Sequence, residues 1–351
     1  MKPTARLLTF MVVLILFVSG CGSSSSQSNN VPATSIDTGQ AAAVSGNGTV
    51  LFPRVVKDGQ GNSVNIAHEP IRVVSATLGT DEILFGLINY THIIAITANA
   101  ADPAQSNISP LAGKIKIHIE KLDPQEIIEY QPDLIFVASN TDPAVIQQFK
   151  DANLPVFVVG NSNSIKDIEN NIKLMGAAVG QEQAADSLVI AMEAKLQAIS
   201  QTIKGAPTST VLYYAPGGTS NGPGSLIDEV ITRAGGTNAV TAGGIKDQFP
   251  KLSDDFVVKQ NPNFMLLAGY NSYAPGFVDN FAKNPSFQAL DALKNKHAIV
   301  VNDAHLATVS QHVVEGVADV AAIIHPNGYD AAAVKTLSST IEAQLSPPDG
   351  S

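Results

Sequence analysis

The sequence predicts an α/β fold with two Rossmann-like lobes, each built on a parallel sheet, and one long helix that joins them. Three observations predict this fold. Short apolar runs alternate with segments of helical periodicity, about 40 consecutive residues after position 163 are helical in pattern, and one helix–proline–strand pattern occurs twice. Strands that alternate with helices are typical of parallel sheets covered by helices on both faces.

The first lobe, residues 51–163, is expected to open with a β-hairpin. Residues 52–66 form two alternating runs around a turn that contains Gly59 and Gly61. Short apolar runs and amphipathic segments then follow one another. The expected strands cover residues 71–75, 92–97, 134–138 and 156–159, and the expected helices cover residues 81–88, 124–130 and 143–152.

The second lobe, residues 206–345, repeats the alternation after Pro207. The expected strands cover residues 210–214, 264–268 and 299–301, and the expected helices cover residues 226–234, 253–259, 276–281 and 310–324. Residues 164–205 lie between the lobes and are rich in helix formers, with Gly176 and Gly180 as interruptions. We expect one helix about 60 Å long here, at 1.5 Å per residue, with a bend near Gly180.

A repeated pattern indicates that the two lobes follow one plan. Residues 125–138 and 255–268 each combine a short helix, a proline that stops it and a buried strand. A cleft is therefore expected between the lobes, and ligands bind beyond the carboxyl ends of parallel strands. The candidate ligand-binding residues that follow strands are Leu78, Gly79 and Thr80 in the first lobe and Tyr213, Tyr214 and Tyr270 in the second.

The N-terminus predicts export and a lipid anchor. Lys2 and Arg6 precede an apolar stretch, residues 7–18, which is shorter than the roughly 20 residues that a membrane span needs. The following Val18-Ser19-Gly20-Cys21 resembles a bacterial lipobox, in which the cysteine receives the lipid. Residues 1–20 are thus the expected signal peptide, Cys21 the lipidation site and the polar residues 21–50 a flexible tether. The protein would be held on the outer face of the cytoplasmic membrane or in the periplasm.

Charge and motifs exclude several functional classes. The chain has 21 basic and 31 acidic residues, and removal of Lys2 and Arg6 changes its net charge from −10 to −12. An acidic chain without a basic run is a poor nucleic-acid binder. It also lacks the G-x-S-x-G, S-x-x-K, H-E-x-x-H and Walker A motifs, so we do not expect an enzyme. The alternatives are an exported hydrolase and a structural or adhesive lipoprotein.

Several segments, taken in order, resemble the class III periplasmic binding proteins that serve importers of iron siderophores, haem and cobalamin. They include Pro70-Ile71-Arg72-Val73-Val74-Ser75, Tyr130-Gln131-Pro132-Asp133-Leu134-Ile135 and Ala234-Gly235-Gly236-Thr237-Asn238, and the resemblance runs from about position 52 to 326. It implies two lobes on a stiff interdomain helix, a monomer without a cofactor, and a metal complex or corrinoid as ligand. The implied partner is the permease dimer of an ABC importer.

The resemblance also assigns roles to residues. An acidic residue on each lobe docks onto permease arginines: Asp255 matches in the second lobe, whereas Gln125 stands at the matching position of the first, which leaves its neighbour Glu126 as the candidate. Tyr213 and Phe249 match aromatic cleft positions, and His118 and His305 fall in loops that border the cleft. The plainer alternatives are core tyrosines, solvated loop histidines and acids that favour a helix dipole.

The expected ligand is near-neutral. Bare zinc or manganese is disfavoured because the seven histidines are scattered, so no metal site is predicted. Anionic catecholate or citrate siderophores call for arginines, and only Arg54, Arg72 and Arg233 remain after signal removal, all at positions expected to point away from the cleft. A corrinoid, a hydroxamate chelate or haem remains. His312 and Glu315 share one helical face, which we expect to lie on the outer surface.

Overall fold

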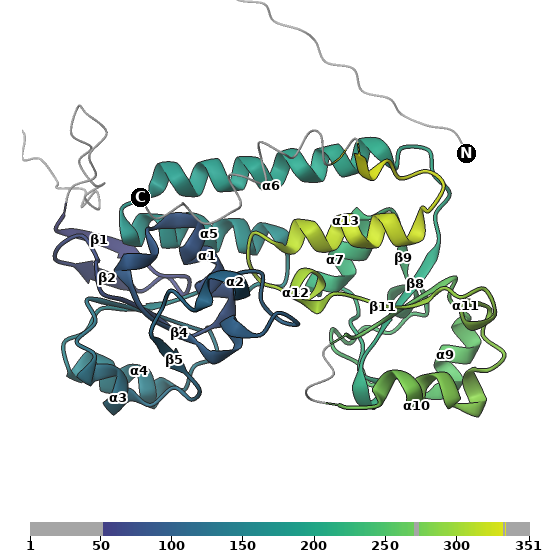
Figure 1. The fold of residues 1–351 in the computed structure, drawn as a ribbon, viewed down its shortest axis with the longest axis horizontal. Helices are drawn as coiled ribbons and strands as arrows, with labels where there is room; N and C mark the ends of the chain where they lie inside the picture. The colour runs from purple at the N-terminus through teal and green to yellow at the C-terminus, as the bar shows by residue number, and fades with distance from the viewer. Residues whose placement is uncertain (1–51, 270–273, 333, 335–351) are drawn as a thin grey trace, which may run out of the picture. The chain divides into compact units, whose positions relative to one another are not determined.

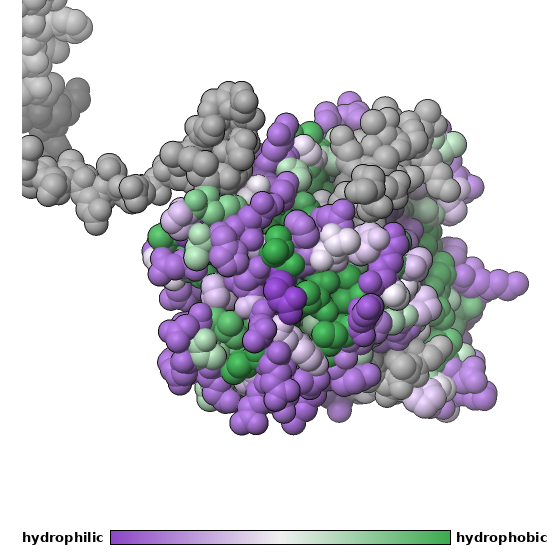
Figure 2. Space-filling model, turned by 60° about the vertical axis from the view of Figure 1, so that its left-hand side comes forward, coloured by the Kyte–Doolittle hydropathy of each residue, from purple (hydrophilic) through white to green (hydrophobic). Residues whose placement is uncertain are grey.

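The computed structural model describes residues 52–269, 274–332 and 334, which belong to one compact unit, Ala42–Ser351 (Figure 1). The expected signal peptide, Cys21, the tether and Tyr270 lie outside the described residues. None of the described helices is long and apolar enough to cross a membrane. The face in Figure 2 is mostly hydrophilic, with hydrophobic residues gathered in a few areas.

The first lobe contains a two-stranded hairpin and a five-stranded parallel sheet. The hairpin pairs β1 (Arg54–Lys57) with β2 (Ser63–Ile66), as predicted. The sheet has the order β5-β4-β3-β6-β7, with β3 (Val73–Ser75), β4 (Ile93–Thr97), β5 (Ile117–Ile119), β6 (Leu134–Val137) and β7 (Val156–Val158). Every residue of β6 is buried, as expected for a strand covered on both faces.

Capping residues explain where the helices of the first lobe begin. The side chain of Thr77 caps α1 (Leu78–Leu87), Asp123 caps α3 (Pro124–Glu129) and Asp142 caps α4 (Pro143–Asp151). Proline occupies the first position of α3 and of α4, where its missing N–H is not needed. The shorter elements are η1 (Tyr90–His92), η2 (Ala98–Ala101) and α2 (Ser109–Ala112).

The second lobe holds a four-stranded parallel sheet of order β11-β10-β8-β9. Its strands are β8 (Thr210–Tyr214), β9 (Thr237–Asn238), β10 (Phe264–Leu267) and β11 (Ala298–Val300). The helices are α7 (Leu226–Arg233), α8 (Ala239–Ala242), α9 (Asp254–Gln260), α10 (Phe277–Lys283), α11 (Asp291–Lys294), α12 (Asp303–Leu306) and α13 (Val313–Ile324). Two short 3-10 helices, η3 (Pro216–Gly218) and η4 (Pro285–Phe287), complete the lobe.

The prediction of a single long helix between the lobes is wrong in one respect. The segment forms two helices, α5 (Ile165–Val179) and α6 (Glu182–Thr202), which pack against each other. Gly180 ends α5 in the left-handed conformation, with φ of 73°, and so reverses the chain instead of bending it. Gly176 allows the close approach, because a Cβ there would lie 2.4 Å from that of Ala185.

Helix α6 alone therefore bridges the lobes. Its 21 residues span about 30 Å. It packs against α1 of the first lobe and α13 of the second, and Figure 1 shows it lying over α5 and α13. The stiff connection that the resemblance implies is thus half as long as predicted, and α5 and α13 each support a part of it.

Candidate functional site

Two adjoining cavities form a cleft where the lobes meet. The larger has a volume of about 510 Å³ and the smaller about 210 Å³, and both are lined by Ala307 and Val309. Residues of both lobes contribute. Leu78 and Gly79 of the first lobe line the smaller cavity, and Ser162 and Asn163, which precede α5, line the larger.

The first lobe reaches the cleft through the start of α1. A Cβ on Gly79 would lie 2.5 Å from Cγ2 of Val309, so only glycine permits this contact between the lobes. Thr80, in contrast, does not line either cavity. It is buried, and its hydroxyl lies 2.7 Å from Oγ of Ser75 and donates to the carbonyl of Thr77 at 2.9 Å. Thr80 therefore fixes the turn that presents Leu78 and Gly79.

The two tyrosines of β8 face opposite sides of their sheet, because successive strand residues alternate. Tyr213 lines the larger cavity, and its hydroxyl lies 3.4 Å from Oδ1 of Asp303. Tyr214 points away from the cleft and packs in an aromatic core with Phe277, Phe281 and Phe287 at ring-centroid distances of 6.1, 5.5 and 5.8 Å. The expectation that Tyr214 binds the ligand is therefore wrong, and burial raises its pKa above the usual range.

Phe249 and Asp303 differ in how they reach the cleft. Phe249 lines the larger cavity with 62% of its surface exposed, which leaves its ring available at the cavity mouth. Asp303 lines the smaller cavity, is only 5% exposed and accepts a hydrogen bond from the backbone N–H of Gly269. Sequence reasoning singled out Phe249, and it placed the segment 302–305, which contains Asp303, at the cleft but chose His305 from that segment as the ligand residue.

The cleft carries little charge. Among its described lining residues, Asp303 is the one acidic side chain and none is lysine, arginine or histidine; the others are apolar or carry hydroxyl or amide groups, such as Gln105, Thr219 and Asn221. The arginine-poor cleft expected from the sequence agrees with this lining.

Neither of the two histidines proposed for the ligand lines the cleft. His118 belongs to the edge strand β5, which sequence reasoning treated as a loop, and its Nε2 lies 3.2 Å from the carbonyl oxygen of Ala112. His305 lies in α12, where its Nδ1 is 2.7 Å from Oδ2 of Asp319. Burial alone lowers the pKa of His305, but the hydrogen bond and charge of Asp319 outweigh it and raise the pKa overall.

Behind the cleft, a buried carboxylate links the lobes. Glu82 of α1 is fully buried and accepts hydrogen bonds from the hydroxyls of Thr308, at 2.6 Å, and Ser310, at 2.5 Å. The backbone N–H of Asn107 donates to the same carboxylate at 2.7 Å. Charge-assisted bonds of this kind are stronger than neutral ones. Sequence reasoning missed the link because its partners lie more than 220 residues apart.

Two ionisable groups beside this link have shifted pKa values. Desolvation raises the pKa of Asp81 to about 8, although the backbone N–H and the hydroxyl of Thr97 donate hydrogen bonds to its Oδ2. Its other oxygen, Oδ1, is buried and has no hydrogen-bond partner among the described residues. His312 is partly buried next to Gln311, and burial lowers its pKa. The expectation that His312 lies on the outer surface is wrong, because its helix packs inward against α6.

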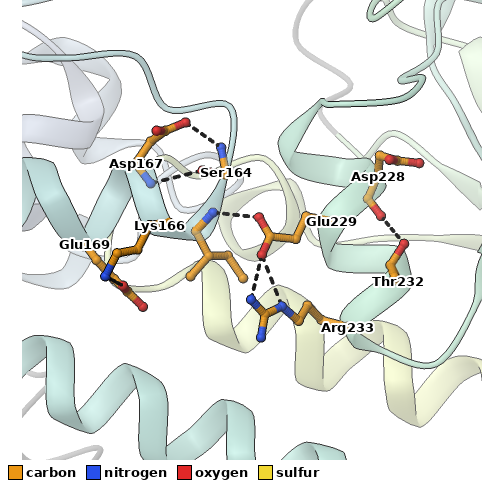
Figure 3. Close-up of polar contacts among 9 residues, drawn as sticks. Ser164, Lys166, Asp167, Glu169, Asp228, Glu229, Thr232 and Arg233 are labelled. Carbon is orange, nitrogen blue, oxygen red and sulfur yellow. Dashed lines mark hydrogen bonds and ion pairs between the residues drawn. The ribbon is translucent and has the colours of Figure 1, made fainter. Parts of the chain in front are cut away.

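A second link between the lobes lies at the start of α5 (Figure 3). Ser164 and Asp167 form a capping box, and the free N–H of Ile165 donates to Oε2 of Glu229 on α7 at 2.9 Å. Nη2 of Arg233 forms an ion pair with the other carboxylate oxygen of Glu229, Oε1, at 3.0 Å. A carboxylate at a helix N-terminus is favoured by the helix dipole. This link therefore fixes α7 of the second lobe against the segment that enters from the first.

The two proposed docking acids are exposed. Glu126 lies on α3 and accepts a hydrogen bond from the hydroxyl of Tyr130, which raises the pKa of that tyrosine. Asp255 lies in the first turn of α9, and its neighbour Asp254 accepts a hydrogen bond from Asn284 at 2.9 Å. Each lobe thus presents an accessible carboxylate.

Residues 73–304 match the family model of the periplasmic binding proteins, which is well over half of the chain, so the chain belongs to that family. The ABC transporter substrate-binding lipoprotein YvrC of Bacillus subtilis (strain 168) is 24% identical over 340 residues, covering 94% of this chain and 99% of YvrC. A cobalamin-binding protein of Halobacterium salinarum (strain ATCC 29341 / DSM 671 / R1) is 20% identical over 320 residues, covering 90% of this chain and 84% of that protein.

Among solved structures, the periplasmic heme-binding protein RhuT from Roseiflexus sp. RS-1 in apo form matches with a TM-score of 0.64 at 21% identity. The match covers 73% of this chain and 98% of RhuT. This likeness concerns the fold. Together with the family match, it confirms the two-lobed α/β architecture and the class of solute-binding proteins that the sequence predicts.

Proposed function

We propose that this protein captures a metal complex without net negative charge, of the corrinoid or ferric-hydroxamate kind, and delivers it to the permease dimer of an ABC importer. The observation that carries the proposal is the charge of the cleft. Asp303 is the one acidic side chain among its described lining residues, none of which is lysine, arginine or histidine, and the remaining polar groups are hydroxyls and amides. Such groups suit the amides of a corrinoid or the carbonyl oxygens of a hydroxamate.

An anionic ligand would meet an unfavourable field in this cleft. Asp303 is a buried carboxylate, and a second negative charge placed beside it is disfavoured because like charges repel each other strongly where little water screens them. Haem, with its two propionates, and ferric citrate are therefore weaker candidates than a neutral or cationic complex. The name of the Halobacterium relative supports a corrinoid, and the larger cavity falls within the usual size range of ligand pockets.

Delivery requires contact with a permease, and Glu126 and Asp255 are the residues we propose for it. Both are exposed, one on each lobe, and carboxylates paired with arginines suit a reversible contact. A lipid on Cys21 would hold the protein at the membrane that contains the importer, as the name of YvrC supports. Retention of a Cys21→Ser variant in washed membranes would rule out this anchor.

We further propose a binding role without catalysis and a monomeric protein. Its described cleft lining contains no histidine to act as a general base for a hydroxyl, and no cysteine or lysine to act as a nucleophile. The test is thermal denaturation of the protein with cyanocobalamin, ferrioxamine B, haem and ferric citrate. A bound ligand at a hundredfold excess over its Kd stabilises by about 2.7 kcal/mol. Stabilisation by none of the four would leave a structural or adhesive role.

A further inference from the structure

A second concave site lies in the first lobe, apart from the cleft. It has a volume of about 500 Å³ and a floor that includes Ile93 and Ile115, both of which are buried. Its walls include the rings of Tyr90 and Tyr130. The pocket therefore offers an apolar and aromatic interior large enough for a small organic molecule.

The position of this pocket separates it from the ligand cleft. It lies beside Arg72 and Ile93, where β3 and β4 begin, whereas Leu78 and Gly79 reach the cleft beyond the carboxyl end of β3. The strands run parallel, so one site lies at the amino ends of the strands and the other at their carboxyl ends. No described residue lines both.

The rim of the pocket is positively charged. Arg72, Lys114 and Lys116 line it, and Glu129 is its one acidic residue. Among the described residues, none of these three cations forms an ion pair. In a protein with a net charge of −10, three cations against one carboxylate around a single pocket form a local site for an anion.

Local contacts hold two of these cations, Arg72 and Lys114, at the rim without cancelling their charge. Nε and Nη2 of Arg72 donate to the carbonyl oxygens of Gln131, at 2.9 Å, and Tyr130, at 2.5 Å. Nζ of Lys114 lies 4.5 Å from the centre of the Tyr90 ring. Lys114 and Lys116 are exposed, whereas Ile115 between them is buried, so the alternation turns both ammonium groups outward around an apolar floor.

We propose that this pocket binds a small anionic amphiphile, in which a carboxylate or phosphate group is attached to a short apolar or aromatic body. The anion would contact the lysine and arginine side chains at the rim, and the apolar body would cover the isoleucines and stack on the tyrosines. The carrier of the anion is either a free organic acid or the headgroup of an acidic lipid. This proposal does not depend on which ligand occupies the cleft.

The experiment uses the protein from residue 22 onward, with isoleucine methyl groups labelled for NMR. It is titrated with 2-naphthoate and, separately, with dihexanoylphosphatidylglycerol below its micelle concentration. Shifts of the Ile93 and Ile115 methyl signals, with Ile227 of the cleft unchanged, are expected for one or both probes. Binding of naphthoate alone identifies a free acid as the ligand type, and binding of the lipid alone identifies a headgroup.

Charge is tested with matched neutral probes and variants. The neutral 2-naphthamide and the zwitterionic dihexanoylphosphatidylcholine should bind at least fivefold more weakly than their anionic counterparts. Lys114→Gln/Lys116→Gln should weaken anion binding about threefold to tenfold, as expected for two exposed charges. Lys150→Gln/Lys259→Gln removes two exposed lysines elsewhere and should change nothing. The proposal is overturned if neither anion shifts these methyl signals, or if the neutral probes bind equally well.

Discussion

The hydroxyl group of Tyr213 lies 3.4 Å from Oδ1 of Asp303, and both residues line the cleft between the lobes. Tyr213 leaves β8 on the cleft side, and Asp303 opens α12 beyond the end of β11. This pair places an aromatic surface beside the one carboxylate of the described cleft lining. It is the feature on which ligand recognition is expected to depend most.

Replacement of Tyr213 by alanine should weaken ligand binding about 5- to 150-fold, because one buried aromatic contact contributes on the order of 1 to 3 kcal/mol. Tyr213 also belongs to the core of the lobe, so the melting temperature should fall by several degrees. Titration and calorimetry measure the two effects separately. Tyr214→Phe is the matched control, since it removes a hydroxyl on the other face of β8 and should leave affinity unchanged. Lower stability without lower affinity would make Tyr213 a core residue only.

Replacement of Glu82 by alanine should destabilise the protein by about 3 kcal/mol. It removes a buried acceptor and leaves the hydroxyls of Thr308 and Ser310, which cross from the second lobe, without that partner. Chemical denaturation measures the change, and Glu129→Ala, at an exposed position, should be silent. A Glu82→Ala variant as stable as the parent protein would show that this link does not hold the lobes together.

Asp81 should make the protein less stable as pH rises. Its folded-state pKa is raised to about 8, from an ordinary 3.8, so between these values the folded state retains a proton that the unfolded state has lost. The stabilising contribution of Asp81 to the free energy of unfolding is therefore fully present below about pH 4 and is lost progressively as the pH rises to about 8. Asp81→Asn, which resembles the neutral acid, should lose less stability between pH 5 and pH 8 than the parent protein, as measured by urea denaturation at each pH. Equal losses in the two proteins would contradict the assignment.

Reversal of the charge at Asp255 should abolish uptake while ligand affinity stays within twofold. The carboxylate is exposed in the first turn of α9 and does not line either cleft cavity. Transport assays in cells that depend on the importer, with titration of the purified Asp255→Lys variant, provide the measurement. Asp279→Lys is a control at another early position of a helix in the same lobe. A loss of ligand affinity in Asp255→Lys would place the residue at the binding site instead.

The sequence allowed the order of strands and helices to be predicted because local signals mark them. Pro132 and Pro262 stop helices before buried strands, and Asp123 and Asp142 cap helices that begin with proline. The helical hairpin of α5 and α6 could not be predicted, because periodicity is the same for a bend and for a reversal. Only the left-handed conformation of Gly180 distinguishes the two.

The site was predicted less completely, because a sequence does not show which face of a strand a side chain occupies or which distant segments pack together. A strand end locates Tyr213 and Tyr214 equally well, and only the packed sheet shows which of them faces the cleft. His312 faces inward because its helix packs against α6, a segment far away in sequence. Leu78 and Gly79 were predicted correctly as cleft-lining positions, since they follow a buried strand of a parallel sheet.

The central claim, that the cleft receives a metal complex without net negative charge, is tested most directly by isothermal titration of the parent protein. Cyanocobalamin and ferrioxamine B are compared with haem and ferric citrate in one buffer at one ionic strength. The account predicts one-to-one binding of a neutral or cationic complex, with affinity at least tenfold higher than for either anionic complex, and a smaller difference in Asp303→Asn. Tighter binding of haem or ferric citrate by the parent protein would contradict it.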